Sequence, residues 1–169
     1  MREIAKLLNE MRDAGLISNY GLFGAIAQMR YTAPVATIDV DVLVAVPDPD
    51  RLDVLAPVYQ YCLDRGFQAE GEAIRVGAWP VQFIPAFSPL TVEAMQDAEV
   101  ADFDGVPLRV VRADYLAAIA LSVGRGKDYA RVLSLLESGH ATRDAIALIA
   151  RRFGLAASWA AFEKRFLHD

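Results

Sequence analysis

The chain has 169 residues, of which 54% are hydrophobic and 23% are charged. This length fits one domain, or one domain with a small helical appendage, and the composition excludes a disordered protein. The net charge is −5, yet residues 116–169 carry 8 basic and 5 acidic side chains, so a polyanion would be drawn to the last third. This mild asymmetry argues against a general nucleic-acid binder but is compatible with a phosphate-bearing substrate.

The chain also predicts where the protein resides. No apolar run approaches the roughly 20 residues that a membrane-spanning helix needs, and the N-terminus has no apolar signal segment. A single cysteine, Cys62, excludes an intramolecular disulfide framework. We therefore expect a cytoplasmic protein that has no membrane contact.

Hydrophobic periodicity predicts a mixed order of elements over the first two-thirds of the chain. Helices are expected at 2–14, 25–31, 51–65 and 89–97, and strands at 20–23, 38–46, 67–70, 73–76, 81–84, 100–103 and 108–111. Pro57 either kinks the third helix or starts a second segment, and Asp104-Gly105 favours a tight hairpin turn. Antiparallel hairpins argue against a purely parallel, doubly wound sheet.

The remaining pattern is helical throughout, with apolar stripes that end at or near glycines. We therefore predict an α/β core over residues 1–111 and a C-terminal helical region over 112–169 that packs on it as one compact unit.

The most informative residues are Asp39 and Asp41. In an extended strand, Thr37, Asp39 and Asp41 line one face, while Ile38 and the alternating valines after it line the core face. Two carboxylates about 6–7 Å apart on such a strand lose hydration and repel each other. Mg²⁺, which takes one or two carboxylates alongside substrate phosphates, would compensate. The alternative is a solvated strand end, and the spacing alone leaves both interpretations open.

A glycine turn precedes this pair. The expected strand at 20–23 runs into Gly24-Ala25 and a helix of small residues, and a helix start of this kind offers bare backbone N–H groups to an anion. Thirteen residues separate Ala25 from Asp39, enough for a short helix and a return into the next strand. The sequence therefore predicts a phosphate site beside a metal-binding pair.

With these residues in place, the chain resembles the nucleotidyltransferase-fold family, specifically its bacterial minimal and abortive-infection-toxin-like branches. The resemblance covers roughly residues 20–138 and is most specific at Gly24-Ala25 followed by Thr37-x-Asp39-x-Asp41. The stretch 81–87 resembles a later strand of that family, and 124–128 with Arg131 resembles its helical Lys-Asp motif. The resemblance implies a mixed β-sheet flanked by helices and two-metal chemistry, and its toxin-like branch leaves open whether the protein belongs to a toxin–antitoxin pair.

The resemblance also implies Mg²⁺-dependent (or Mn²⁺-dependent) transfer of a nucleoside monophosphate from an NTP to RNA, a protein hydroxyl or a small molecule. The residues that it assigns are Asp39 and Asp41 as metal ligands, Asp39, Asp41 and Lys127 as catalytic residues, and Gly24, Ala25, Thr37, Gln82, Lys127 and Asp128 as nucleotide-binding residues.

Three positions depart from the family pattern. Ala25 replaces a serine, Val35 replaces an arginine, and Gln82 stands where a third metal carboxylate is usual. Glu70 and Glu72, on a neighbouring strand, are candidate replacements for that carboxylate.

These departures keep two other hypotheses open: a catalytically degenerate relative that binds a nucleotide or a partner protein, and a plain interaction protein without a ligand. Lys127 and Asp128 also have a structural interpretation, as a helix start with Asp128 in its first turn and Arg131 one turn on.

Overall fold

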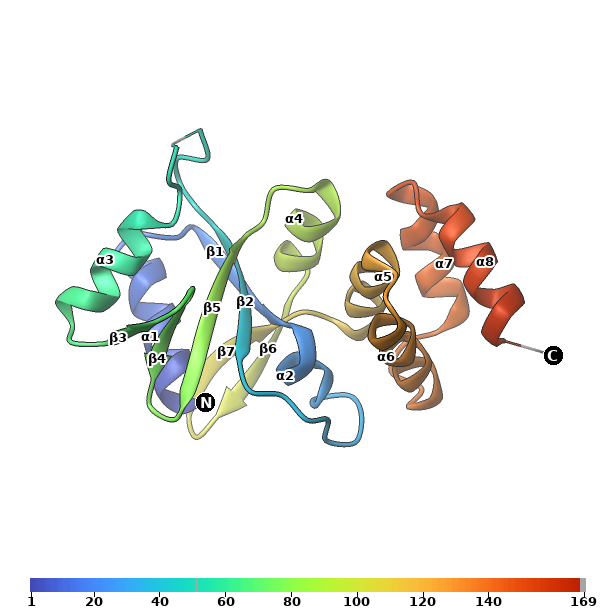
Figure 1. Cartoon of the computed structure of the whole chain (residues 1–169), viewed down its shortest axis with the longest axis horizontal. Coiled ribbons are helices and arrows are strands. Elements are labelled where there is room, and N and C mark those ends of the chain that lie inside the picture. The colour runs from blue at the N-terminus through green and yellow to red at the C-terminus, as the bar shows by residue number, and fades with distance from the viewer. Residues whose placement is uncertain (51, 168–169) are drawn as a thin grey trace.

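The computed structural model describes residues 1–50 and 52–167, and these form one mixed seven-stranded sheet with helices on both faces (Figure 1). The strand order is β3-β4-β5-β2-β1-β7-β6. The strands are β1 (Asn19–Phe23), β2 (Val40–Ala45), β3 (Gln68–Glu70), β4 (Ala73–Val76), β5 (Trp79–Pro85), β6 (Glu99–Phe103) and β7 (Val106–Val110). The helices are α1 (Arg2–Asp13), α2 (Gly24–Gln28), α3 (Ala56–Asp64), α4 (Pro89–Gln96), α5 (Ala113–Val123), α6 (Gly126–Glu137), α7 (Arg143–Arg152) and α8 (Ala156–Phe166).

The centre of the sheet combines both strand directions. β1 runs antiparallel to β2, whereas β5 is parallel to β2 and β7 is parallel to β1. Antiparallel hairpins complete the two edges, and β6–β7 turns at Asp104-Gly105, where both residues have a positive φ. The predicted mixed sheet and this hairpin turn are therefore confirmed.

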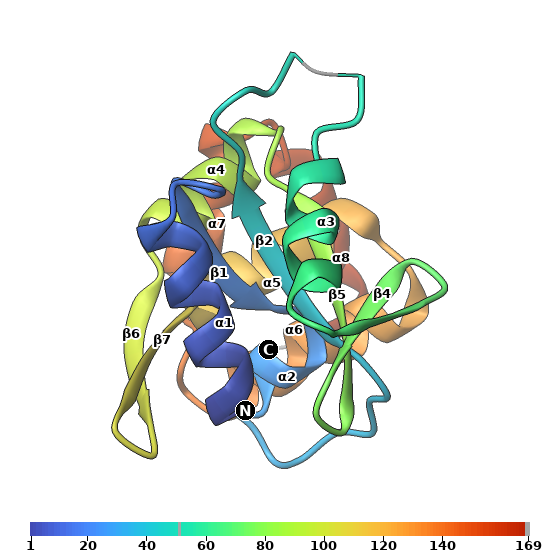
Figure 2. The same ribbon diagram turned by 90° about the vertical axis from the view of Figure 1, so that its left-hand side faces the viewer.

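The core lies between the sheet and helices on both of its faces. Helices α1 and α3 cover one face (Figure 2), α2 and α4 pack against the other, and α5 packs on α2 and α4. α1 buries the apolar residues Ile4, Leu7, Leu8 and Met11, as its helical spacing predicts. The inward residues of β2, Val40, Val42 and Val44, are fully buried.

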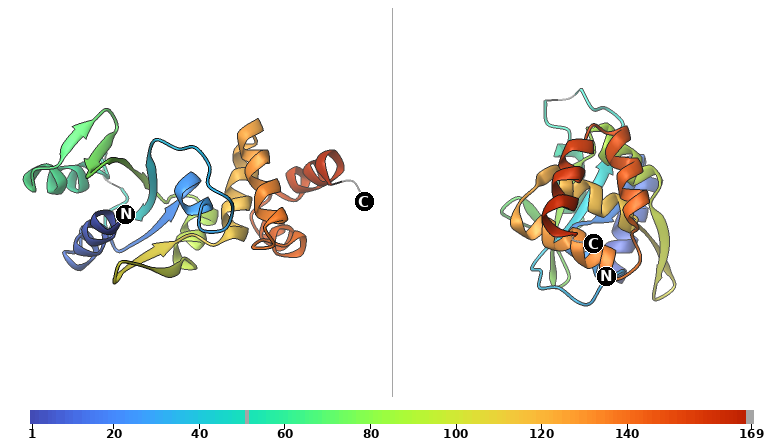
Figure 3. Two further views of the ribbon diagram at one scale, coloured as in Figure 1. Left: turned by 90° about the horizontal axis from the view of Figure 1, so that it is seen from below. Right: turned by 90° about the vertical axis from the view of Figure 1, so that its right-hand side faces the viewer.

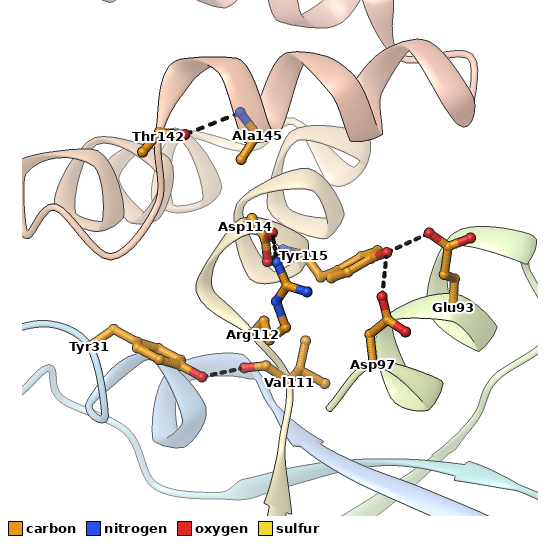
Figure 4. Close-up of polar contacts among 9 residues, drawn as sticks. All are labelled: Tyr31, Glu93, Asp97, Val111, Arg112, Asp114, Tyr115, Thr142 and Ala145. Carbon is orange, nitrogen blue, oxygen red and sulfur yellow. Dashed lines mark hydrogen bonds and ion pairs between the residues drawn. The ribbon is translucent and has the colours of Figure 1, made fainter. Parts of the chain in front are cut away.

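Helices α5–α8 extend the molecule away from the sheet, so that α1 and α8 lie at opposite ends (Figure 3). A polar joint fixes them to the core (Figure 4): the Tyr115 hydroxyl of α5 contacts the carboxylates of Glu93 and, at 3.1 Å, Asp97. Glu93 on α4 also accepts a hydrogen bond of 2.6 Å from Arg152 on α7. One carboxylate thus connects α4, α5 and α7.

The strand that carries the aspartates begins later than predicted. β2 starts at Val40, so Thr37 to Asp39 lie in irregular backbone before it. The prediction that Ile38 belongs to the core is wrong, because its side chain is 85% exposed. Side chains alternate between the two faces only where the hydrogen-bonded ladder holds the backbone extended, and this ladder begins at Val40, one residue after Asp39.

Three other elements have boundaries that differ from the prediction. α3 begins at Ala56 with Pro57 in its first turn, so this proline starts the helix rather than kinking it. The predicted start at Arg51 lies outside the described residues. α2 has only five residues, fewer than expected, and β5 extends back through Pro80 to Trp79.

None of the described helices is long and apolar enough to cross a membrane.

We predict that Tyr115→Phe lowers the free energy of unfolding by about 2 kcal/mol. The substitution removes a hydroxyl that hydrogen-bonds to ionised groups, and such bonds contribute about 1.5–3 kcal/mol. Urea unfolding followed by circular dichroism measures the change. Tyr61→Phe is the matched control, since that partly exposed ring stacks against Arg65 and should leave stability unchanged. Equal stability of the Tyr115 variant and wild type would show that the joint contributes nothing.

Candidate functional site

A cleft of about 980 Å³ opens between the sheet and the helices α5 and α6. One wall comes from the segment before β2, from the start of α2 and from β5. The other wall comes from the end of α5 and from α6 as far as Ser134. Every residue that the sequence assigned to the site lines this cleft: Gly24, Ala25, Thr37, Asp39, Asp41, Gln82, Lys127 and Asp128. The fold thus brings together positions that are up to 104 residues apart.

Gly24 is required by the position of Asp41. Its φ is +69°, a left-handed conformation that side chains disfavour. A Cβ atom there would lie 2.3 Å from Oδ2 of Asp41, which is closer than any real contact. Only glycine lets the start of α2 approach this carboxylate, so the glycine turn and the aspartate form one unit.

Asp39 is held by its neighbour. The Thr37 hydroxyl lies 3.1 Å from Oδ1 and 3.1 Å from the backbone carbonyl of Asp39, and it can donate to either oxygen. Residues 37–39 lie outside the sheet ladder, so no strand pairing holds Asp39. The Thr37 hydroxyl restrains its carboxylate instead. Thr37 therefore orients Asp39.

Asp41 is half-buried, and its pKa is raised above the usual value. Burial is the main cause, and repulsion from Asp39 adds to it, while Arg131 and Lys127 pull the pKa of Asp41 the other way. Two carboxylates that repel each other are the arrangement that a divalent cation relieves. The ionised form of Asp41 therefore destabilises the folded protein when no cation is bound.

Gln82 lies directly beside Asp41. β2 and β5 are parallel, and Asp41 is the register partner of Gln82, so both side chains are on the cleft face of the sheet. A carboxylate at this position would stand next to Asp41. The glutamine supplies an uncharged amide there.

Glu70 and Glu72 do not supply the third carboxylate. Glu70 pairs with Arg75, its Oε2 lying 2.5 Å from Nε, beside a smaller hollow that also includes Ile38 and Trp79. The backbone carbonyl of Glu72 accepts from Tyr59, away from the cleft. Over residues 1–50 and 52–167, no group of three or more His, Cys, Asp or Glu side chains is placed to hold a metal ion.

Asp128 has a structural task at the start of α6. Its Oδ2 accepts hydrogen bonds from the Arg125 backbone N–H, at 3.1 Å, and from the Arg125 Nε, at 2.7 Å. Burial would raise the pKa of Asp128, but these bonds lower it below its usual value. Asp128 thus caps the helix and directs Arg125 at the cleft, while the exposed Lys127 stands free of this capping arrangement.

Four further polar residues line the cleft, and the site assignment from sequence did not include them: Gln28, Arg125, Arg131 and Ser134. Arg131 Nε donates a 2.9 Å hydrogen bond to Oε1 of Gln28, which is only 4% exposed. Burial lowers the pKa of Arg131, whereas Asp128 and Asp41 raise it. The sequence indicated Arg131 only weakly, through its position one turn after Asp128. It gave no indication of Gln28, because the hydrogen bond between Gln28 and Arg131 joins residues 103 positions apart.

Comparison with known proteins identifies the fold. Neither a protein-family model nor a curated protein matches this sequence. The solution structure of antibiotic-resistance factor ANT(2'')-Ia is similar, with a TM-score of 0.52, 14% identity, and coverage of 98% of this chain and 96% of that one. A crystal structure of an antigenic nucleotidyltransferase-like protein from Paracoccidioides brasiliensis is also similar, with a TM-score of 0.55, 14% identity, and coverage of 98% and 97%. The chain therefore has a nucleotidyltransferase-like fold, as the resemblance implied; its abortive-infection branch stays a prediction.

We predict that Asp41→Asn makes the metal-free protein more stable at pH 7. The folded pKa of Asp41 lies above its unfolded value of about 3.8, so the ionised side chain destabilises the fold at neutral pH. Asparagine removes that charge. The gain should be largest at neutral pH and shrink as the pH falls through the folded pKa toward 3.8. Thermal unfolding between pH 3.5 and 8 with EDTA measures it.

Asp48→Asn, at an exposed turn, is the control and should match wild type across the same range. A loss of stability in Asp41→Asn at pH 7 would contradict the electrostatic interpretation of the pair.

Proposed function

We propose that the protein is a metal-dependent nucleotidyltransferase that transfers a nucleoside monophosphate from an NTP to an acceptor hydroxyl. One observation carries the proposal: Asp39 and Asp41 stand on one wall of a single cleft, and Lys127 and Arg131 stand on the other. A metal–nucleotide complex has the same division of charge, because its cation binds carboxylates and its phosphates bind lysine and arginine side chains. The nucleotidyltransferase-like fold supports this assignment.

The donor set fits a hard divalent cation. Asp39 and Asp41 offer carboxylate oxygens, which Mg²⁺ and Mn²⁺ prefer, and two carboxylates are the number that Mg²⁺ takes when phosphates complete its coordination. When bound, the cation would polarise the α-phosphate and neutralise charge on the leaving pyrophosphate.

The other residues act on the nucleotide. Lys127 and Arg131 would contact its phosphates, and Arg125 is directed to the same region by Asp128. The backbone at Gly24-Ala25 would receive a phosphate oxygen close to Asp41. RNA, a protein and a small molecule are the three classes of acceptor that remain to be screened, and an RNA or protein acceptor would favour the toxin-like branch.

Nucleotide titration tests the proposal. We expect calorimetry to show binding of at least one of ATP, CTP, GTP and UTP that requires Mg²⁺, and at least about tenfold weaker binding in Asp39→Asn and Asp41→Asn, because each removes a charged metal ligand. Asp48→Asn is the matched control. Release of pyrophosphate in an acceptor screen then reports transfer.

Two results would contradict the proposal. Binding without Mg²⁺ that Asp39→Asn leaves unchanged would indicate a non-catalytic nucleotide binder, for which Gln82 and Ala25 would be the cause. Absence of binding for all four nucleotides would indicate an interaction protein.

A further inference from the structure

The acidic wall of the cleft carries fewer charges than a two-cation site needs. Asp39 and Asp41 are its only carboxylates, apart from Asp128, among the described residues that line the cleft, and Asp128 is neutralised by Arg125. Gln82 stands beside Asp41 in the sheet and contributes a neutral oxygen. Two carboxylates balance one divalent cation in full.

The opposite wall carries a positive charge that is fixed in place. Arg131 reaches across from α6 and is held by Gln28, whose side chain is almost wholly buried in α2. Its guanidinium interacts favourably with Asp41 across the cleft. A second divalent cation near Asp41 would meet this guanidinium and Lys127, and like charges a few ångströms apart inside a partly desolvated cleft repel strongly.

We infer that the cleft holds one divalent cation with each nucleotide rather than two, and that Arg131 takes over the electrostatic role of the second cation. Gln82 sets this number, because the second cation has no charged ligand of its own. Arg131, unlike an exchangeable ion, is part of the chain and is already in place before the nucleotide binds.

This inference rests on the proposed function, since it concerns the same nucleotide site. Mn²⁺ is the probe, because it replaces Mg²⁺ in oxygen-ligand sites and is paramagnetic. Equilibrium dialysis of Mn²⁺ with the saturating α,β-methylene analogue of each of ATP, CTP, GTP and UTP, none of which can be cleaved at the α-phosphate, counts the ions bound to each chain. Low-temperature electron paramagnetic resonance reports whether two ions lie within the roughly 3.5–4 Å of a two-metal site, where their spins couple.

We expect wild type to bind one Mn²⁺ for each bound nucleotide and to give an uncoupled six-line spectrum. Gln82→Asp should raise the count to two and give a spin-coupled spectrum, and Gln82→Glu provides the same carboxylate should the shorter side chain fall short. A coupled pair in wild type would overturn the inference while leaving the proposed function intact. A single ion in both carboxylate variants would overturn the role given to Gln82.

Arg131→Gln tests the other half. Loss of a fixed charge that hydrogen-bonds to phosphate should weaken binding of the Mn²⁺–nucleotide complex at least about tenfold. Arg131→Lys, which keeps the charge, should recover part of that loss, and Arg65→Gln on the far side of the sheet should match wild type. Unchanged affinity in Arg131→Gln, with the fold verified by circular dichroism, would overturn the role of Arg131. Absence of any Mn²⁺ and nucleotide binding in wild type would overturn the proposed function as well.

Discussion

The partly buried negative charge of Asp41, with Asp39 beside it, is the constraint on which the rest of the site depends. The pair sits where the central strand β2 begins, and the cost of keeping Asp41 ionised there falls on the stability of the fold. Several neighbouring features make sense as responses to it. Gly24 gives the carboxylate of Asp41 room, Thr37 restrains that of Asp39, and Arg131 places a compensating charge across the cleft.

The features that could be predicted from sequence are those with a local cause. β-branched residues at alternate positions identify β2, and Asp104-Gly105 identifies the β6–β7 hairpin because both positions need a positive φ. The aspartate pair and the preceding glycine are likewise close in sequence, and the expected order of strand, glycine turn, short helix and strand predicts that they lie together. The prediction fails where side chains no longer alternate between the two faces of a strand. Ile38 fits the alternating sequence pattern, but it lies before the β2 ladder begins and its side chain faces solvent.

Features that depend on long-range packing could not be predicted in this way. The basic wall of the cleft exists only because α6 returns to α2, and Gln28, which holds Arg131 there, lies 103 residues away in the chain. Nothing in the spacing around Gln28 distinguishes it from any other helical glutamine. The register of β5 against β2 is similar: that Gln82 lies beside Asp41 follows from a parallel pairing across about 40 residues.

The two walls of the cleft belong to different parts of the chain, and this makes the helical part more than an appendage. Asp39 and Asp41 move with the sheet, whereas Lys127 and Arg131 move with α6, which packs on α5. The position of α5 is set by its contacts with α4, including the Tyr115 hydroxyl between Glu93 and Asp97. The separation between the carboxylates and the lysine and arginine side chains is therefore set by this polar joint outside the cleft together with the hydrogen bond from Arg131 to Gln28 inside it.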